Sequence, residues 1–242
     1  MAKIHEHRRA AFGINALSAW LGFGMSLVIE IFGLVKIDPS TNKTPASEFG
    51  YVGHYADGLA GAPARVIDLL SYFTIWSQIV VGIVMTMLWL KPNRDEPWLR
   101  WLRLSSIMMI IVTGVVYNLL LGPNFPPVGL NKISSAIEHT ITPIITVVVF
   151  FIWGPRSWFS PKNIMKALLI PIAYVIYTLI RGAIVGLYPY GFFDVVTNGY
   201  VSVLVFVGGI LVAAIVVKLM LWAYDETHVR KFTRDRSSNE LI

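Results

Sequence analysis

Six long apolar stretches limit what this chain can fold into more than any other feature of its sequence. Each has about 20 mostly apolar residues or more, the length that an α-helix needs to cross the hydrocarbon core of a bilayer. Only 14% of the 242 residues are charged and 55% are hydrophobic, which is too little charge to cover a soluble domain of this size. We therefore expect an all-α membrane protein of six transmembrane helices. The spans lie at roughly 14–36, 66–90, 101–121, 134–154, 165–187 and 200–223, within a single domain 1–242 that ends in a tail at 224–242.

Lysine and arginine are distributed unequally between the two ends of these spans. Fifteen lie on the side that holds the N-terminus and the C-terminal tail, four lie on the opposite side, and Arg181 falls within a span. Because cytoplasmic loops are enriched in these residues, the sequence predicts that both termini are cytoplasmic. The loop at 37–65 is then extracytoplasmic. The tryptophans that gather at the basic edge agree with this orientation: Trp89, Trp98, Trp101, Trp153, Trp158 and Trp222.

Composition also excludes several function classes. The formal charge of +6 comes from short basic clusters at helix ends, which indicate topology and lipid contact and not nucleic acid binding. There is no cysteine, and His139 is the one histidine of five that lies within a span. A b-type haem would need two histidines at membrane depth, so we expect no haem, no metal site and no other cofactor.

Five of the predicted helices each carry a polar side chain in one layer of the outer leaflet. A rise of 1.5 Å per residue, counted from the outer end of each span, puts these groups ~5 to ~12 Å deep. They are Glu30, Thr74, Asn118, His139 and Arg181. Polar residues also form stripes on single helix faces, which lipid cannot satisfy, so the sequence predicts a polar pocket that opens to the outside.

Each of these residues also has a structural explanation. An intramembrane threonine commonly bonds to the carbonyl four residues earlier. Glu30 and Arg181 lie at similar depth and can form an ion pair, Asn118 can bridge two helices, and Glu138 lies close enough to the outer rim to reach water. A lone histidine on a polar stripe is the strongest functional candidate, because intramembrane ionisable groups are expensive.

Physical chemistry leaves two kinds of activity open for such a pocket. In acyl transfer, a hydroxyl attacks a carbonyl, His139 shuttles the proton, and Arg181, Asn118 or a backbone N–H stabilises the oxyanion. The same groups can instead form a pathway for protons or solutes.

Three segments resemble a known family. Residues 73–78 (FTIWSQ) and 138–143 (EHTITP) are similar to the segments that carry the nucleophilic threonine and the catalytic histidine of the androgen-induced-gene family. Residues 188–194 (YPYGFFD) resemble that family's Tyr-Pro-aromatic-acidic stretch. The family, which includes the androgen-dependent regulator of tissue factor pathway inhibitor, consists of multi-pass membrane threonine hydrolases that cleave fatty acid esters of hydroxy fatty acids (FAHFAs).

The resemblance implies that the chain is a bacterial-type member of this family and a lipid esterase of the inner (plasma) membrane. Thr74 is then the nucleophile and His139 the base. Its substrate is then a lipid ester, and its surroundings are membrane lipids. Glu30 or Asp194 are candidates for a third group that orients the imidazole. The remaining supporting or oxyanion candidates are Gln78, Asn118, Tyr177 and Arg181.

Two alternatives belong to other classes. A proton-coupled transporter would use Glu30, His139 and Arg181, although no internal repeat is evident and the polar layer is off-centre. A non-catalytic lipid-binding protein or scaffold would use the same pocket and would release its lipid intact.

Overall fold

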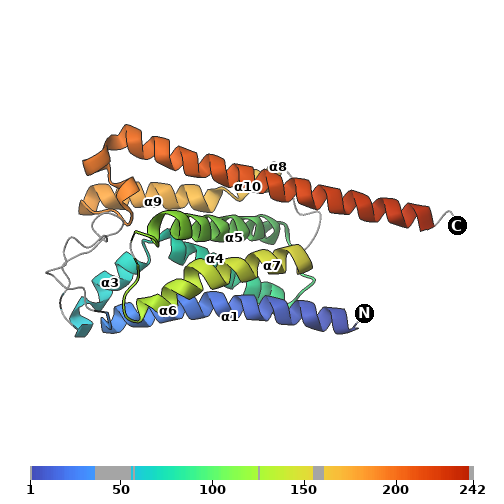
Figure 1. Ribbon diagram of the computed structural model, residues 1–242, viewed down its shortest axis with the longest axis horizontal. Helices are drawn as coiled ribbons and strands as arrows, with labels where there is room; N and C mark the ends of the chain where they lie inside the picture. Colours follow the sequence, from blue (N-terminus) through green and yellow to red (C-terminus); the bar gives the residue numbers. More distant parts are fainter. Residues whose placement is uncertain (1, 36–55, 57, 125, 155–160, 240–242) are drawn as a thin grey trace.

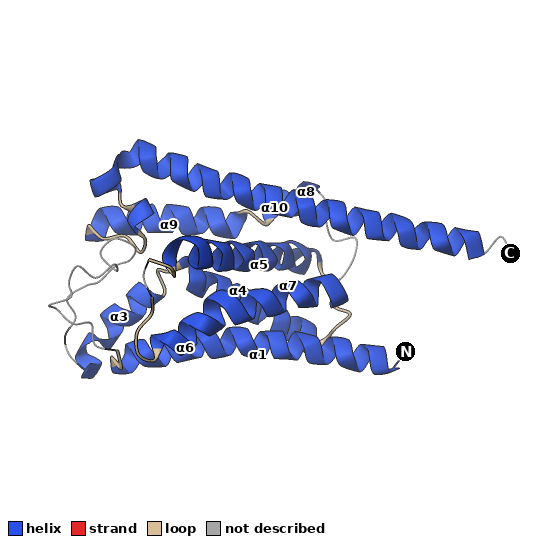
Figure 2. Cartoon of the chain, viewed as in Figure 1, coloured by secondary structure: helices blue, strands red, loops and turns tan. Residues whose placement is uncertain are grey.

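The computed structural model describes residues 2–35, 56, 58–124, 126–154 and 161–239. In these ranges the chain is helical apart from short connections, with no strand (Figure 2). Six helical segments are long and apolar enough to cross a membrane: Glu6–Phe32, Phe73–Leu90, Pro97–Leu121, Asn131–Trp153, Asn163–Val185 and Val195–Tyr224. The predicted all-α fold with six helices long enough to span a membrane is therefore confirmed, although the first begins eight residues before, and the second seven residues after, the expected position.

The long helices lie side by side along one axis, and the N- and C-termini are at the same end of the bundle (Figure 1). Helix α1 (Ala2–Phe32) packs most extensively on α4 (Phe73–Leu90), which also contacts α5 (Pro97–Val116). Their shared core is apolar, with Phe12, Val81 and Met109 fully buried. This packing brings α4 into the middle of the molecule, where it contacts helices on both sides.

The segment predicted as one span at 66–90 is two helices, and in this the prediction is wrong. Helix α3 (Ala62–Leu69) ends before α4 begins, because Tyr72 has extended backbone angles (φ −84°, ψ 135°). Aromatic side chains satisfy the backbone groups that this break frees. Trp76 Nε1 donates to the carbonyl of Leu70 (2.8 Å), and the Tyr174 hydroxyl donates to that of Ser71 (3.0 Å).

The fourth span consists of α6 (Asn131–Ala136), the π-helical turn η4 (Ile137–Ile141) and α7 (Thr142–Trp153). Pro143 has no N–H, so the carbonyl of His139 lacks its usual helical donor and accepts from Asn118 Nδ2 at 2.8 Å instead. Gly114 permits this close approach of α5, since a Cβ there would lie 3.0 Å from Pro143 Cβ. Helix α5 likewise continues into a π-helical turn, η3 (Tyr117–Leu121).

The last two spans are less buried inside the molecule than the others. Helices α8 (Pro161–Lys166) and α9 (Leu169–Val185) precede the 3₁₀ turn η5 (Gly191–Phe193) and α10 (Val195–Asn239). Helix α10 bends at Gly199, where φ is 74°, and extends past the bundle at the end that holds the termini (Figure 1). The predicted tail at 224–242 therefore continues α10 as far as Asn239.

At the end away from the termini, Arg65 anchors α3 to the end of α1. Its guanidinium donates to the carbonyls of Glu30 (2.6 Å) and Ile31 (3.2 Å), and to that of Gly58 (2.7 Å). The 3₁₀ turn η2 (Gly58–Gly61) leads into α3. Most of the loop predicted at 37–65 lies outside the described residues.

Candidate functional site

Thr74 and His139 meet at the end of the bundle away from the termini. Thr74 is the second residue of α4, and its Oγ1 lies 3.1 Å from Nε2 of His139, which is in the π-helical turn η4. The Thr74 side chain is buried, with 8% of its surface exposed. Helix rise predicted that these two groups lie at a similar depth in the membrane, and the contact of α4 with η4 brings them within hydrogen-bonding distance.

The imidazole is held by its other nitrogen. Nδ1 of His139 lies 3.0 Å from the carbonyl oxygen of Ser135 and 3.1 Å from its Oγ. Since a carbonyl oxygen only accepts, Nδ1 carries the proton, and Nε2 is free to accept from the hydroxyl of Thr74. The Tyr117 ring stacks on the imidazole with centroids 3.6 Å apart, and the Tyr117 hydroxyl accepts from Ser135 Oγ at 2.7 Å.

Ser135 therefore orients the imidazole of His139, the role for which Glu30 and Asp194 were candidates. Asp194 instead caps α10, where it accepts from the N–H of Val196 (2.9 Å) and from Thr197 Oγ1 (2.6 Å). The spacing of Ser135 from His139, four residues on one helix, is the signal that could have identified it from sequence.

Two amide side chains hold the turn that carries His139. Gln78 Nε2 donates to the carbonyl of Glu138 at 2.8 Å, and Asn118 Nδ2 donates to that of His139 at 2.8 Å. Asn118 is therefore the helix bridge that the sequence allowed. Glu138 does not lie at a wet rim as expected, because its side chain is buried and accepts from Ser26 Oγ at 2.7 Å.

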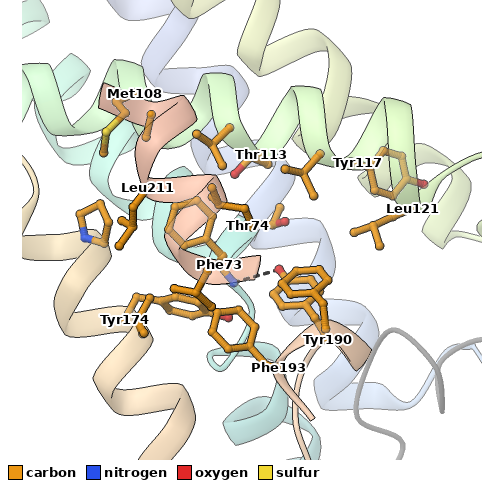
Figure 3. A pocket seen from close by; sticks show the side chains of 18 residues that line it. Phe73, Thr74, Met108, Thr113, Tyr117, Leu121, Tyr174, Tyr190, Phe193 and Leu211 are labelled. Carbon is orange, nitrogen blue, oxygen red and sulfur yellow. Dashed lines mark hydrogen bonds between the residues drawn. The ribbon is translucent and has the colours of Figure 1, made fainter. Parts of the chain in front are cut away.

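Tyr190 approaches the nucleophile candidate from the η5 segment. Its hydroxyl accepts from the N–H of Phe73, the residue before Thr74, at 3.0 Å (Figure 3). Burial raises the pKa of Tyr190 to about 12, against the opposing effect of its hydrogen bonding at the start of α4, so the phenol stays protonated at neutral pH. Tyr190 belongs to the 188–194 segment that the resemblance singled out, but no role was predicted for it.

An apolar cavity begins beside Thr74 and runs between α4, α5, α9 and α10 (Figure 3). About 680 Å³ of space in and in front of it is not filled by atoms, a figure that includes open solvent. Thr74, Tyr117 and Tyr190 line the outer part, whereas Met108 and Ala214 lie on the parts of α5 and α10 nearer the termini. The lining is mostly apolar, which differs from the polar pocket expected from the sequence.

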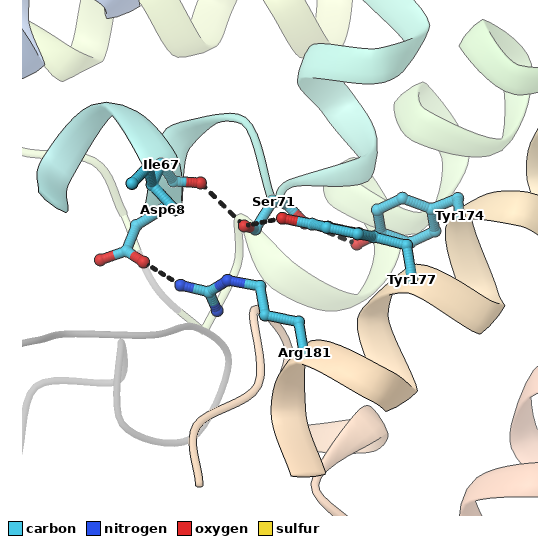
Figure 4. A network of polar contacts seen from close by, with 6 residues as sticks. All are labelled: Ile67, Asp68, Ser71, Tyr174, Tyr177 and Arg181. Carbon is cyan, nitrogen blue, oxygen red and sulfur yellow. Dashed lines mark hydrogen bonds and ion pairs between the residues drawn. The ribbon is translucent and has the colours of Figure 1, made fainter. Parts of the chain in front are cut away.

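The charged residues of this end form a separate network (Figure 4). Arg181 of α9 pairs with Asp68 of α3, and not with Glu30 as the sequence suggested. The Tyr177 hydroxyl lies 2.9 Å from Ser71 Oγ, which also donates to the Ile67 carbonyl. Burial raises the pKa of Asp68 to about 7, although Arg181 acts in the opposite direction. The network ties α3 to α9 and so fixes the connection that enters α4.

Within the described ranges, no group of three or more histidine, aspartate or glutamate side chains is placed to hold a metal ion. Comparisons of the chain with models of protein families, with curated proteins and with solved structures give no match. The six long apolar helices define the class of the protein: it is an all-helical, multi-pass membrane protein. Within that class, this protein has a threonine–histidine pair whose threonine lines an apolar cavity.

Proposed function

We propose that the protein is a membrane-embedded hydrolase that cleaves lipid esters, such as FAHFAs, with Thr74 as nucleophile and His139 as general base. One observation carries the proposal. Thr74 Oγ1 lies 3.1 Å from an imidazole nitrogen whose protonation is set by the Ser135 carbonyl, and Thr74 is one of the residues that line the apolar cavity. A hydroxyl, an adjacent base and a group that orients the base are the parts that nucleophilic acyl transfer requires.

In the acylation step, Thr74 Oγ1 forms a bond to the ester carbonyl carbon as its proton passes to His139 Nε2. The carbonyl electron pair moves onto oxygen and gives a tetrahedral oxyanion. When that pair returns, the bond to the alcohol oxygen breaks and the leaving alkoxide takes the proton from Nε2. The products are an acyl-threonine and a free alcohol, which in a FAHFA is the hydroxy fatty acid.

In the deacylation step, water replaces the alcohol beside His139. Nε2 removes a proton from the water as its oxygen bonds to the acyl carbon. Collapse of the second tetrahedral intermediate breaks the bond to Thr74 Oγ1, which regains a proton from Nε2 and releases the fatty acid. Throughout the cycle the Ser135 carbonyl accepts from Nδ1 and holds the imidazole in place.

The dimensions of the cavity support an acyl substrate. From Met108 on α5 to Tyr117 at the start of η3 the lining advances nine residues, which is ~14 Å at the helical rise of 1.5 Å per residue. One leaflet of a bilayer has a hydrocarbon thickness of ~15 Å, half of the ~30 Å core. The lining is therefore about as long as the acyl chains of one leaflet.

Ester hydrolysis by purified variants tests the proposal. We expect Thr74→Ala to lower kcat/KM by roughly 10³-fold or more, as loss of a nucleophile does, and Thr74→Ser to retain turnover. Ser77→Ala is the matched control, because Ser77 is a buried hydroxyl one turn further along α4 that bonds to Thr113 at 2.8 Å and does not line the cavity. Equal turnover by Thr74→Ala and Ser77→Ala would overturn the threonine mechanism.

The apolar lining favours one second candidate, a non-catalytic lipid-binding protein. Such a protein would hold an ester in the same cavity and release it intact after long incubation, whereas the hydrolase yields acid and alcohol. The contacts support a proton-coupled transporter less well, because Arg181 bonds to Asp68 across the α3–α9 junction and is not directed toward His139.

We infer that the end with the termini faces the cytoplasm of a bacterial inner membrane and that the Thr74 end faces outward, from the excess of basic residues at the former. The chain has no cysteine, so single cysteines report the side directly. An impermeant maleimide added to intact cells should label Leu59→Cys, next to α3, and should label Lys91→Cys, after α4, only once the cells are lysed. The reverse pattern would invert the topology.

A further inference from the structure

Tyr190 is held against the first residues of α4. Its ring is buried in a cluster with Tyr174 and Phe193, and the ring edge meets Tyr72 at 5.6 Å between centroids. The phenolic oxygen accepts from the N–H of Phe73, the residue before Thr74, at 3.0 Å. No side chain at the N-cap position Tyr72 makes a capping bond, so Tyr190 supplies the acceptor that this helix start needs.

These contacts determine what the phenolic proton can do. A tyrosine hydroxyl has one proton to donate, and one lone pair of its oxygen here accepts from the N–H of Phe73. The proton remains available for an acceptor. The N–H that donates to the phenol also polarises its O–H bond and makes it a stronger donor. Tyr190 and Thr74 both line the cavity, so a carbonyl at Thr74 has this donor beside it.

We propose that Tyr190 is a further catalytic residue, whose O–H donates a hydrogen bond to the carbonyl oxygen that becomes the oxyanion when Thr74 attacks. This inference rests on the proposed hydrolase function. No proton leaves the phenol: the hydrogen bond shortens as charge develops on the carbonyl oxygen, and it relaxes when the leaving alcohol departs. The other oxyanion candidates are engaged elsewhere, Arg181 by Asp68 and Asn118 by the carbonyls of Gly114 and His139.

Tyr190→Phe removes the hydroxyl and keeps the ring. We expect kcat for a long-chain ester to fall by about 10²- to 10³-fold, the effect of losing one oxyanion donor, with KM changed much less. Tyr188→Phe is the matched control, because Tyr188 is a buried tyrosine of the same segment that does not line the cavity, and it should keep wild-type kcat. Circular dichroism and thermal unfolding of both variants check that α4 remains folded.

A capping tyrosine with no part in the chemistry would also lose a hydrogen bond in Tyr190→Phe, so a second measurement separates the two roles. Incorporation of fluorotyrosines at position 190 keeps the hydroxyl and the ring and changes the donor strength of the O–H. A donor to the oxyanion predicts that kcat varies systematically with the number of fluorines, whereas a cap alone predicts one kcat for the series.

The Thr74 and Tyr190 variants together distinguish an error in the assignment of Tyr190 from an error in the proposed hydrolase function. If Thr74→Ala abolishes turnover but Tyr190→Phe and the fluorotyrosine series retain wild-type kcat, the assignment of Tyr190 is overturned and the hydrolase stands. If Thr74→Ala retains turnover, both are overturned. Loss of kcat in Tyr190→Phe with a graded fluorotyrosine series supports the assignment.

Discussion

At the residue scale, the reactive pair depends on groups that are not themselves nucleophile or base. Ser135 and Tyr117 hold the imidazole of His139 in place. Asn118 donates to the His139 carbonyl in place of the N–H that Pro143 lacks. The sequence predicted that Thr74 and His139 share a level, because depth follows from helix rise alone. It suggested Glu30 as the partner of Arg181, whereas the partner is Asp68, because the pairing depends on how α3 folds back beside α9.

The Asp68–Arg181 pair gives a pH dependence at this scale. Burial raises the pKa of Asp68 to about 7, so the folded protein binds this proton more tightly than the unfolded chain, in which an aspartate has a pKa of about 3.9. The contribution of this group to stability is therefore present below about pH 4 and is lost as the pH rises through about 7. We expect the Tm of the wild type to fall from this contribution as the pH rises from about 4 to about 7, and to level off above that.

Asp68→Asn cannot titrate, so its Tm should change less than that of the wild type over the same interval. Asp95→Asn, in the exposed connection between α4 and α5, should keep the wild-type dependence. Parallel curves for the wild type and Asp68→Asn, measured by thermal unfolding in detergent, would contradict the role given to Asp68.

At the scale of elements, hydropathy predicted the helices well and their interruptions poorly. Apolar runs of about 20 residues are strong signals, and all six spans are present. The break at residues 70–72 is not marked by glycine or proline, and it is stabilised by distant aromatic residues such as Tyr174. Long-range contacts of this kind do not appear in local sequence patterns, and the π-helical turns are recognisable only in part, from Pro143.

The same contacts explain why the site contains Thr74 at a helix start. Had residues 66–90 formed one helix, the N–H of Phe73 would bond to the carbonyl four residues earlier and could not bond to Tyr190. The break therefore creates the environment of the nucleophile candidate. The proposed nucleophile therefore lies at the irregular start of α4 and not in its regular part.

The position of α10 beside the cavity gives a prediction about substrate length. Ala214 is 3% exposed and lies at the end of the lining away from Tyr190, whereas its neighbour Ala213 faces outward. Phenylalanine at 214 should fill that end of the cavity. We expect Ala214→Phe to lower kcat/KM for long-chain acyl esters by about tenfold or more, on the scale of one or a few methylenes excluded from an apolar pocket.

Short-chain esters do not reach this depth, so Ala214→Phe should hydrolyse them as the wild type does. Ala213→Phe adds the same bulk to the outer face of α10 and should leave the chain-length profile unchanged. A profile in Ala214→Phe equal to that of the wild type would show that the acyl chain does not occupy this cavity.

At the scale of the whole molecule, the termini share one end of the bundle and the reactive pair lies at the other. The aromatic and polar connections at that end, α3 and η5, close over the start of α4, while the apolar cavity extends beneath them between the helices. A lipid ester can thus have its carbonyl near the membrane surface and its chain among the helices. The sequence predicted the layer of polar groups, but the apolar cavity depends on how α9 and α10 pack against α5.

The most direct test of the account is to locate the covalent intermediate by mass spectrometry. The purified protein is exposed briefly to an ester or a fluorophosphonate probe, quenched in acid and digested, and Ser77→Ala is treated in parallel. The account predicts a single adduct on Thr74, present in Ser77→Ala and lost in Thr74→Ala. Turnover of ester without any adduct on Thr74, or an adduct on another side chain that persists in Thr74→Ala, would contradict it.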